Sequence, residues 1–241
     1  MDWELELGSW DLNLAIVIPA HNEAENLPLV IGDIHRLAAL ADQTEIIVVD
    51  NGSTDETARI AQAAGAHVVA EPRRGYGYAC LAGVRAALVH SAETLIFLDG
   101  DYSFDPSEIP SLVEPLRNNR ADLVLGSRFL SRNQAAMLPH QRFGNWLTAR
   151  LMGELYGLRV SDLGPYRAIR AELLTQLDLR EMTYGWPTEM MVKAAKRGAR
   201  IVEAPVSYRP RHAGQSKVSG TLRGSVLAGY FILWTTLKHA R

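Results

Sequence analysis

The chain has 241 residues, of which 47% are apolar and 22% charged, and this composition excludes disordered, fibrous and membrane-spanning proteins. Its formal net charge of −2 divides into about −13 for residues 1–127 and about +11 for residues 128–241. The acidic first half argues against a nucleic-acid-binding surface, whereas the basic second half favours an anionic partner such as phosphate groups or a membrane.

Short apolar strands alternate with helical patterns along the first half of the chain. The helical spacing of apolar residues predicts helices at 27–37 and 78–90, and runs rich in β-branched residues predict strands at 14–18, 45–49, 67–69, 94–98 and 122–125. Nearly continuous apolar strands separated by helices are typical of a mainly parallel sheet that is covered by helices on both faces. The sequence therefore predicts an α/β fold.

Two further segments are interpreted from their local signals. Ser53 and Glu56 have the spacing of a capping box, which predicts a helix that starts there and ends at Gly65. Pro110 and Pro115 are expected to break the segment between the last two predicted strands.

Polar loops follow the predicted strands, at the sheet edge where α/β proteins bind ligands. Asp99 and Asp101 come directly after the most apolar strand, and two carboxylates so close together favour a hard divalent cation that also binds a substrate diphosphate. Asp50 ends another strand and suits hydrogen bonding to a nucleobase or ribose. Gly75 and Gly77 lie at a helix start, where backbone amides can approach a phosphate.

Several other classes of site are excluded. Cys80 stands where a dinucleotide-binding fingerprint needs its last glycine, and the chain has no P-loop motif. As the single cysteine, Cys80 also permits no disulfide framework and suits a reducing cytoplasm. The histidines do not show the spacing of a metal-ligand cluster, so we interpret them individually and expect no zinc site.

The apolar segment near the C-terminus is too short to span a bilayer, because 14 residues separate Arg223 from Lys238 and about 20 are needed. Basic residues precede it, so a helix there suits an anionic membrane surface. Packing of the same helix against the domain core is the alternative. The acidic N-terminus lacks the features of a signal peptide, so we do not expect secretion.

Seven segments in chain order resemble the pattern of a known family over nearly the whole chain: VIPAHNE at 17–23, VDNGSTD at 49–55, GYGYA at 75–79, DGD at 99–101, GSR at 126–128, GPYR at 164–167 and RHAGQSK at 211–217. This set resembles glycosyltransferase family 2 on a GT-A fold, and particularly its dolichyl-phosphate mannose and polyprenyl-phosphate glucose synthases. Seven ordered segments are far more specific than any one of them.

The resemblance implies a nucleotide pocket of Pro19, Ala20, Glu23 and Asp50, a metal and nucleotide-sugar site of Asp99 and Asp101, and phosphate contacts from Arg128, Arg142 and Lys217. Ser103 stands where the family often has a glutamine that also binds the metal, and its hydroxyl would be a weaker ligand. His21 and Asn51 replace a commoner tyrosine and aspartate, so the donor's base and sugar are not assigned.

The implied activity is a Mg²⁺- or Mn²⁺-dependent inverting transfer of a hexose from a UDP- or GDP-sugar to a polyprenyl or dolichyl phosphate. Such an acceptor is already ionised and needs no strong base. A saccharide hydroxyl acceptor is the alternative; it requires a base, for which Glu189 is the candidate, although Glu189 also suits a helix N-terminus. Arg128 has a similar alternative as a structural ion-pair residue. A nucleotide-sugar-binding protein without turnover is the third possibility.

The resemblance and the C-terminal pattern predict two parts of the chain. Residues 1–218 form the GT-A domain, and residues 219–241 form a C-terminal helix that is amphipathic or packed on the core. The expected location is cytoplasmic, with peripheral contact at the inner face of the membrane. No nucleic-acid partner is expected.

Overall fold

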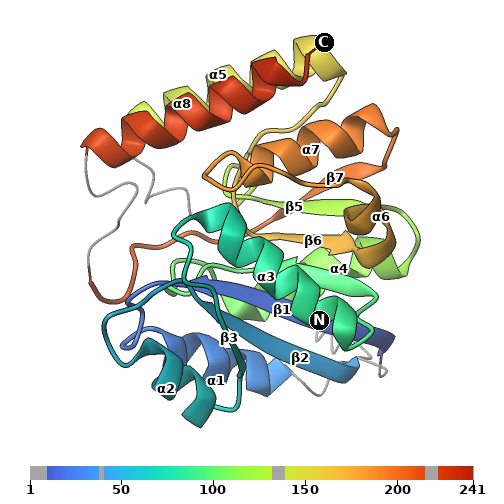
Figure 1. Ribbon diagram of the computed structural model, residues 1–241. Coiled ribbons are helices and arrows are strands. Elements are labelled where there is room, and N and C mark those ends of the chain that lie inside the picture. The colour runs from blue at the N-terminus through green and yellow to red at the C-terminus, as the bar shows by residue number, and fades with distance from the viewer. Residues whose placement is uncertain (1–9, 38–40, 132–138, 215–221, 241) are drawn as a thin grey trace.

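The computed structural model describes residues 10–37, 41–131, 139–214 and 222–240. A seven-stranded sheet lies between layers of helices (Figure 1). The strands are β1 (Trp10–Ala20), β2 (Ala41–Asp50), β3 (His67–Ala70), β4 (Thr94–Phe97), β5 (Leu123–Ser127), β6 (Arg167–Arg170) and β7 (Ile201–Pro205). The helices are α1 (Leu27–Leu37), α2 (Thr57–Ala63), α3 (Tyr76–Val89), α4 (Ile109–Arg117), α5 (Pro139–Tyr156), α6 (Ala171–Gln176), α7 (Trp186–Lys196) and α8 (Leu222–Lys238), with a 3₁₀ turn, η2, at Pro106–Glu108.

The strand order is β3-β2-β1-β4-β6-β5-β7. Neighbouring strands pair in parallel except at β6, which is antiparallel to both β4 and β5. The prediction of a mainly parallel α/β sheet is therefore confirmed. Because β6 runs opposite to its neighbours, the carboxyl ends of the other six strands, including Ala20, Asp50 and Ser127, lie at one edge of the sheet.

Alternate residues of the central strands fill two separate hydrophobic cores. Leu14, Ile16 and Ile18 of β1 pack with α1, α2 and α4 on one face. Ala15 and Val17 point to the other face, where they pack with buried residues of α3, α6 and α7. Both faces of β1 are thus buried, as its unbroken apolar sequence predicts.

Helix α5 and the C-terminal helix α8 lie side by side at one end of the molecule (Figure 1), and α8 also packs against α7. Ala228, Thr235 and Thr236 of α8 are buried, whereas Tyr230 and Trp234 remain more than half exposed. The described part of the helix is therefore packed against the rest of the protein and leaves large apolar side chains exposed. Among the described residues, the structure has no helix that combines the length and apolarity needed to cross a membrane.

Two local predictions from the sequence are wrong. The segment with Pro110 and Pro115 is helix α4, because Pro110 lies in its first turn and the helix buries Leu112 and Leu116 against the sheet. The capping box of Ser53 and Glu56 does not form. Helix α2 begins later, at Thr57, and the side chain of Asp55 accepts hydrogen bonds from the backbone and hydroxyl of Thr57.

Candidate active site

The loops after β1 and β2 are tied together by backbone-to-side-chain hydrogen bonds. The backbone NH of Asn22 donates to Ser53 Oγ at 3.0 Å, and the NH of Thr54 donates to Asn22 Oδ1 at 2.8 Å. Asp50 Oδ1 accepts a hydrogen bond of 2.9 Å from the NH of Ser53. The predicted nucleotide-pocket residues therefore come together at the carboxyl edge of the sheet: Pro19 and Ala20 at the end of β1, Glu23 just after it, and Asp50 at the end of β2.

Asn51 connects this pair of loops to the segment after β3. Its Nδ2 donates to the carbonyl oxygens of Glu71 and Arg73 at 2.9 and 2.7 Å, and its Oδ1 accepts from the NH of Gly75 at 3.0 Å. An aspartate cannot donate to those two carbonyls. The amide at position 51 therefore has a structural role that the sequence analysis missed.

An acidic cluster of Asp99, Asp101 and Glu23 lies at the end of β4. Burial, followed by the charges of Asp101 and Glu23, raises the pKa of Asp99 from its usual 3.8 to about 7. Asp101 Oδ1 accepts a hydrogen bond of 3.0 Å from the NH of Ser103, whose side chain is buried. The arrangement supplies several oxygen donors whose negative charges repel one another, and a divalent cation would relieve that repulsion.

Asp99→Asn is expected to stabilise the metal-free protein at pH 8. The folded state keeps the proton of Asp99 up to about pH 7 and the unfolded state loses it near pH 4, so the carboxyl makes stability fall as the pH rises between these values. Removing the charge should recover up to about 4 kcal/mol at pH 8 but only about 1.5 kcal/mol at pH 5. Urea unfolding in EDTA at both pH values measures this, with Asp105→Asn as the matched control. An equal gain at pH 5 and pH 8 would contradict the interpretation.

The segment that follows β7 folds back onto the same edge. Arg211 Nη2 lies 2.6 Å from Glu23 Oε2, and both side chains are largely buried, with 14% and 8% exposed. Asn26 Oδ1 accepts from the NH of Ala213 at 2.9 Å, and the NH of His212 donates to the carbonyl oxygen of Asp101 at 3.3 Å. Glu23, predicted in the nucleotide pocket, therefore also anchors a segment from the far end of the chain.

Arg128 follows β5 and is held by Asp162. Its Nε and Nη2 each lie 2.7 Å from an oxygen of Asp162, its backbone NH donates to the same carboxylate, and Asp162 is fully buried. The guanidinium also lies 5.2 Å from the centre of the Tyr208 ring, and its charge acts on Asp99. Both interpretations of Arg128 are thus compatible, since the ion pair fixes a cation next to the acidic cluster.

The structure explains Gly75 and Gly77 by close packing. A Cβ atom at either position would clash with the backbone of residues 181–182. Both amides are already used, because Gly75 donates to Asn51 Oδ1 and Gly77 donates to the carbonyl oxygen of Met182. In this conformation both amides therefore have partners within the chain, and a phosphate contact from Gly75 and Gly77 stays a prediction.

Glu189 is buried at the start of α7 and has a full set of partners. Its Oε2 accepts hydrogen bonds from the NH groups of Arg180 and Glu181 at 2.8 and 2.7 Å, and its Oε1 lies 2.8 Å from Lys193 Nζ. This geometry favours the helix-terminus interpretation over a catalytic base. Arg142 is exposed on α5 with its guanidinium 6.0 Å from the centre of the Phe129 ring, and Lys217 lies outside the described residues.

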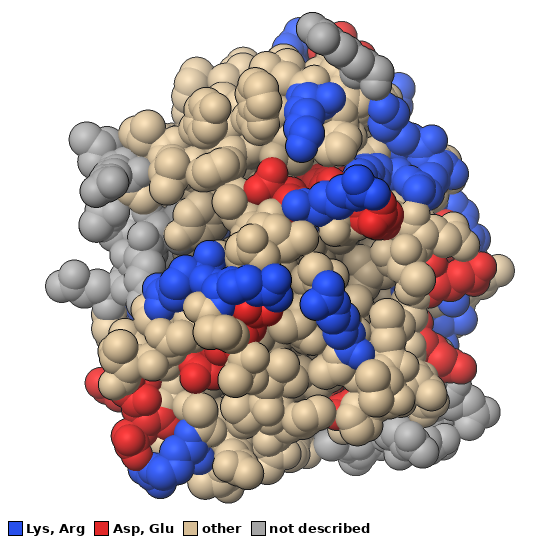
Figure 2. All heavy atoms as spheres, viewed as in Figure 1, with Lys and Arg blue, Asp and Glu red and all other residues tan. Residues whose placement is uncertain are grey.

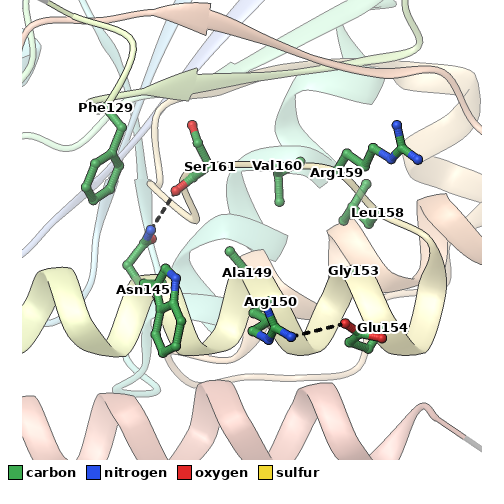
Figure 3. A pocket seen from close by; sticks show the side chains of 11 residues that line it. Phe129, Asn145, Ala149, Arg150, Gly153, Glu154, Leu158, Arg159, Val160 and Ser161 are labelled. Atoms are coloured by element: carbon green, nitrogen blue, oxygen red, sulfur yellow. Dashed lines mark hydrogen bonds and ion pairs between the residues drawn. The ribbon is translucent and has the colours of Figure 1, made fainter.

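A pocket of about 500 Å³ lies between α5 and the segment 158–161 (Figure 3). Phe129, the residue after Arg128 in the chain, forms part of its wall. Apolar side chains make up much of its wall, and Asn145 closes it at one side by donating to the carbonyl oxygen of Ser161 at 2.7 Å. Figure 3 shows Arg150 paired with Glu154 along the same helix, at 3.7 Å. The pocket is thus an apolar space with charged groups at its rim, next to the candidate site.

The family model of glycosyl transferase family 2 matches residues 15–177, from the middle of β1 to the end of α6. The chain belongs to this family. It is therefore an enzyme of the glycosyltransferase class, as the sequence predicts, and its fold agrees with the GT-A type.

Several relatives of this family 2 glycosyltransferase match its sequence over most of its length. An uncharacterized glycosyltransferase of Mycobacterium tuberculosis is 42% identical over 89% of this chain and 94% of its own. An undecaprenyl-phosphate mannosyltransferase of Micrococcus luteus is 34% identical over 90% and 91%, and a polyprenol monophosphomannose synthase of Mycolicibacterium smegmatis is 32% identical over 86% and 81%.

Among solved structures, this glycosyltransferase resembles glucosyl-3-phosphoglycerate synthase of Mycobacterium tuberculosis in complex with Mn²⁺, uridine diphosphate and phosphoglyceric acid. The TM-score is 0.75 with 25% sequence identity, over 95% of this chain and 78% of the other. The GT-A-like architecture predicted from the sequence is thereby confirmed.

Proposed function

We propose that this glycosyltransferase moves a hexosyl group from a nucleoside-diphosphate sugar to a polyprenyl phosphate at a membrane surface. The observation that carries the proposal is the acidic cluster of Asp99, Asp101 and Glu23 beside the fixed cation of Arg128 at the carboxyl edge of the sheet. The names of two relatives, a mannosyltransferase of undecaprenyl phosphate and a polyprenol monophosphomannose synthase, support the acceptor class.

Asp99 and Asp101 are proposed to hold Mg²⁺ or Mn²⁺, with Ser103 as a third, weaker ligand. The donor set fits a hard cation, because it consists of oxygen atoms. Burial, followed by the charges of Asp101 and Glu23, raises the pKa of Asp99 to about 7, and a bound cation would favour its ionised form. When bound, the ion would neutralise negative charge on the donor diphosphate. The Mn²⁺ and uridine diphosphate in the neighbouring synthase structure support the same pairing.

The chain's own residues would bind and orient the two substrates. Pro19, Ala20 and Asp50 line the position proposed for the nucleoside, and Glu23 keeps the wall formed by Arg211 in place. Arg128, which Asp162 holds in place, would contact phosphate oxygens. Holding an already ionised acceptor oxygen near the anomeric carbon supplies most of what an in-line displacement requires, and no basic side chain is needed.

The pocket beside α5 is proposed to receive the first isoprene units of the acceptor. It begins at Phe129, next to Arg128, and Arg142 lies at the same end of α5. An apolar pocket that starts beside phosphate-binding cations complements a lipid with an anionic head. Arg142 and Lys217 are proposed as further contacts of the acceptor phosphate.

Helices α5 and α8 present a surface that suits membrane contact, which we call the aromatic surface. Its large exposed side chains on α8 are Val226, Leu227, Tyr230, Trp234 and Leu237, and those on α5 are Phe143 and Trp146. In Figure 2 the surface over α8 is mostly free of charged side chains. Tyrosine and tryptophan are favoured at the boundary between water and lipid, so this surface would seat the enzyme on the membrane that holds its acceptor.

The double variant Tyr230→Ser and Trp234→Ser is expected to lose at least tenfold in vesicle binding. Burying each large side chain contributes about 1.5–3 kcal/mol, so removing two weakens partition into lipid strongly. Co-sedimentation with anionic vesicles measures binding, and turnover of a short, soluble polyprenyl phosphate should stay unchanged. Val89→Ser is the control, because it removes an exposed apolar side chain from α3, outside the aromatic surface. Vesicle binding of the double variant equal to that of the wild type would contradict a membrane role for the aromatic surface.

The proposed function is tested by release of nucleoside diphosphate from a panel of UDP- and GDP-sugars with Mn²⁺, with and without a short polyprenyl phosphate. We expect turnover of one donor that depends on the lipid phosphate. Metal-dependent donor binding without any effect of the lipid would reject the acceptor and leave the family activity intact.

A second candidate acceptor is a soluble molecule with a hydroxyl group. The neighbouring synthase, whose structure contains phosphoglyceric acid, favours this alternative. The partners of Glu189 argue against it, because that carboxylate is occupied by two NH groups and a lysine and is not available as a base. Adding phosphoglycerate and simple saccharides to the same assay distinguishes the two acceptor classes.

A further inference from the structure

Three potential metal ligands meet at the edge of the sheet opposite the candidate active site. Glu45 lies in β2, His67 is the first residue of β3, and His90 follows the last residue of α3. Glu45 Oε1 lies 2.8 Å from His67 Nδ1 and 3.5 Å from His90 Nε2, and one ligand atom from each residue lies within 4.8 Å of the others. The expectation that no histidines cluster is therefore wrong for His67 and His90.

This cluster is separate from the acidic cluster at Asp99. Glu45 pairs with Ala15 in the sheet, and Ala15 pairs with Leu95 of β4. Asp99 comes four residues after Leu95, which corresponds to roughly 13 Å along a strand at about 3.3 Å per residue. The two groups therefore belong to different edges of the sheet.

The carboxylate of Glu45 has an unused buried oxygen. Glu45 Oε2 is shielded from solvent and has no hydrogen-bond partner within the part of the chain that the structure describes. Buried carboxylate oxygens are normally satisfied, and an unsatisfied one destabilises the fold. His67 Nδ1 and His90 Nε2 both approach the carboxylate of Glu45. The two imidazole rings lie edge to face with centres 5.3 Å apart. A cation at this position would satisfy all three side chains.

We propose that Glu45, His67 and His90 bind a divalent transition-metal ion, with Zn²⁺ as the preferred one. Two imidazole nitrogens and one carboxylate form a common zinc ligand set. Ligands about 2.0–2.1 Å from a tetrahedral zinc ion lie roughly 3.3 Å from one another, so the observed separations need only small side-chain shifts. His67 and His90 are partly exposed, with 42% and 50% of their side chains accessible, which leaves room for water as the fourth ligand.

The chemistry of the cluster separates it from the candidate active site. Imidazole nitrogen suits zinc, cobalt and nickel, whereas the all-oxygen set of Asp99 and Asp101 suits Mg²⁺ and Mn²⁺. An ion held by Glu45, His67 and His90 would join the C-terminal end of α3 to the edge strand β3 and its neighbour β2. It would stabilise the folded chain by binding only to that state and would take no part in the transfer.

The test is zinc binding by the full chain in the Asp101→Asn background, which weakens the other site. Calorimetry should give one zinc ion per chain, and thermal unfolding should shift upward by several degrees. His67→Ala and His90→Ala should each weaken binding at least tenfold. His140→Ala removes an exposed histidine of α5 outside the cluster and should bind zinc as the parent does.

Binding of Co²⁺ distinguishes loss of a metal ligand from a general loss of structure, because the visible absorption of Co²⁺ reports its coordination directly. The parent should show the visible absorption of tetrahedral Co²⁺, and His67→Gln should lose it while keeping its far-ultraviolet circular dichroism. Transferase turnover of the histidine variants should equal that of the wild type. Zinc binding that is absent from the parent, or that is equal in the parent, His67→Ala and His90→Ala, would overturn the proposal and identify the cluster as a set of ion pairs.

Discussion

Asp101→Asn is expected to lower turnover at least about 10³-fold and to leave the fold intact. The substitution keeps the shape of the side chain and the oxygen that accepts the NH of Ser103, but it removes one of two charges proposed to hold the cation. Losing metal stabilisation of the departing diphosphate raises the barrier by several kcal/mol, and about 4 kcal/mol corresponds to 10³-fold. Initial rates of nucleoside diphosphate release at saturating Mn²⁺ measure the effect.

Asp105→Asn is the matched control for Asp101→Asn. Asp105 lies four residues later, and its Oδ1 accepts the NH of Ser107, a contact that asparagine can also make. The rate of nucleoside diphosphate release by Asp105→Asn should therefore stay close to that of the wild type. A rate for Asp101→Asn within tenfold of the wild type would contradict the metal assignment. Tight donor binding without turnover in the wild-type protein would instead support a binding role.

Asp162→Ala is expected to destabilise the protein by about 3–5 kcal/mol. Asp162 is fully buried and accepts two bonds from the side chain of Arg128, one from its backbone and one of 2.8 Å from the NH of Leu163. Removing it leaves the largely buried guanidinium of Arg128 without its partner, which costs far more than losing a surface pair. Urea unfolding measures the change.

Asp122→Ala is the control for the effect of burial. Asp122 pairs with Arg200 at 2.7 Å in a similar bidentate geometry, but 23% and 46% of the two side chains are exposed. Exposed pairs contribute about 0–1 kcal/mol, so this variant should be only slightly destabilised. Equal losses for Asp122→Ala and Asp162→Ala would show that burial does not determine the strength of the Arg128 contact.

The central strands and the first helix could be predicted because their physics is local. Leu27, Val30, Ile31 and Ile34 repeat at helical spacing and are all buried on one face of α1. The unbroken apolar runs of β1 and β4 likewise predicted strands buried on both faces. Patterns of this kind report burial directly, and the structure agrees with them.

Contacts between distant segments could not be predicted in this way. The antiparallel strand β6 is only four residues long, and its place between β4 and β5 is set by pairing with both. The partner of Arg128 is 34 residues away, although Asp162 lies just before a motif that we singled out. Gly77 was interpreted as a phosphate contact, but its lack of a side chain serves the backbone at Met182. One sequence carries no direct record of such pairings.

The contact between Glu23 and Arg211 joins residues that are 188 positions apart. During synthesis on a ribosome the sheet strands emerge before Arg211, so the proposed nucleotide pocket stays open along the side that Arg211 and Ala213 later cover. A nascent chain that already contains the sheet therefore cannot yet present the completed pocket. A ribosome must therefore have released the chain at least as far as Ala213 before this side of the proposed pocket can close.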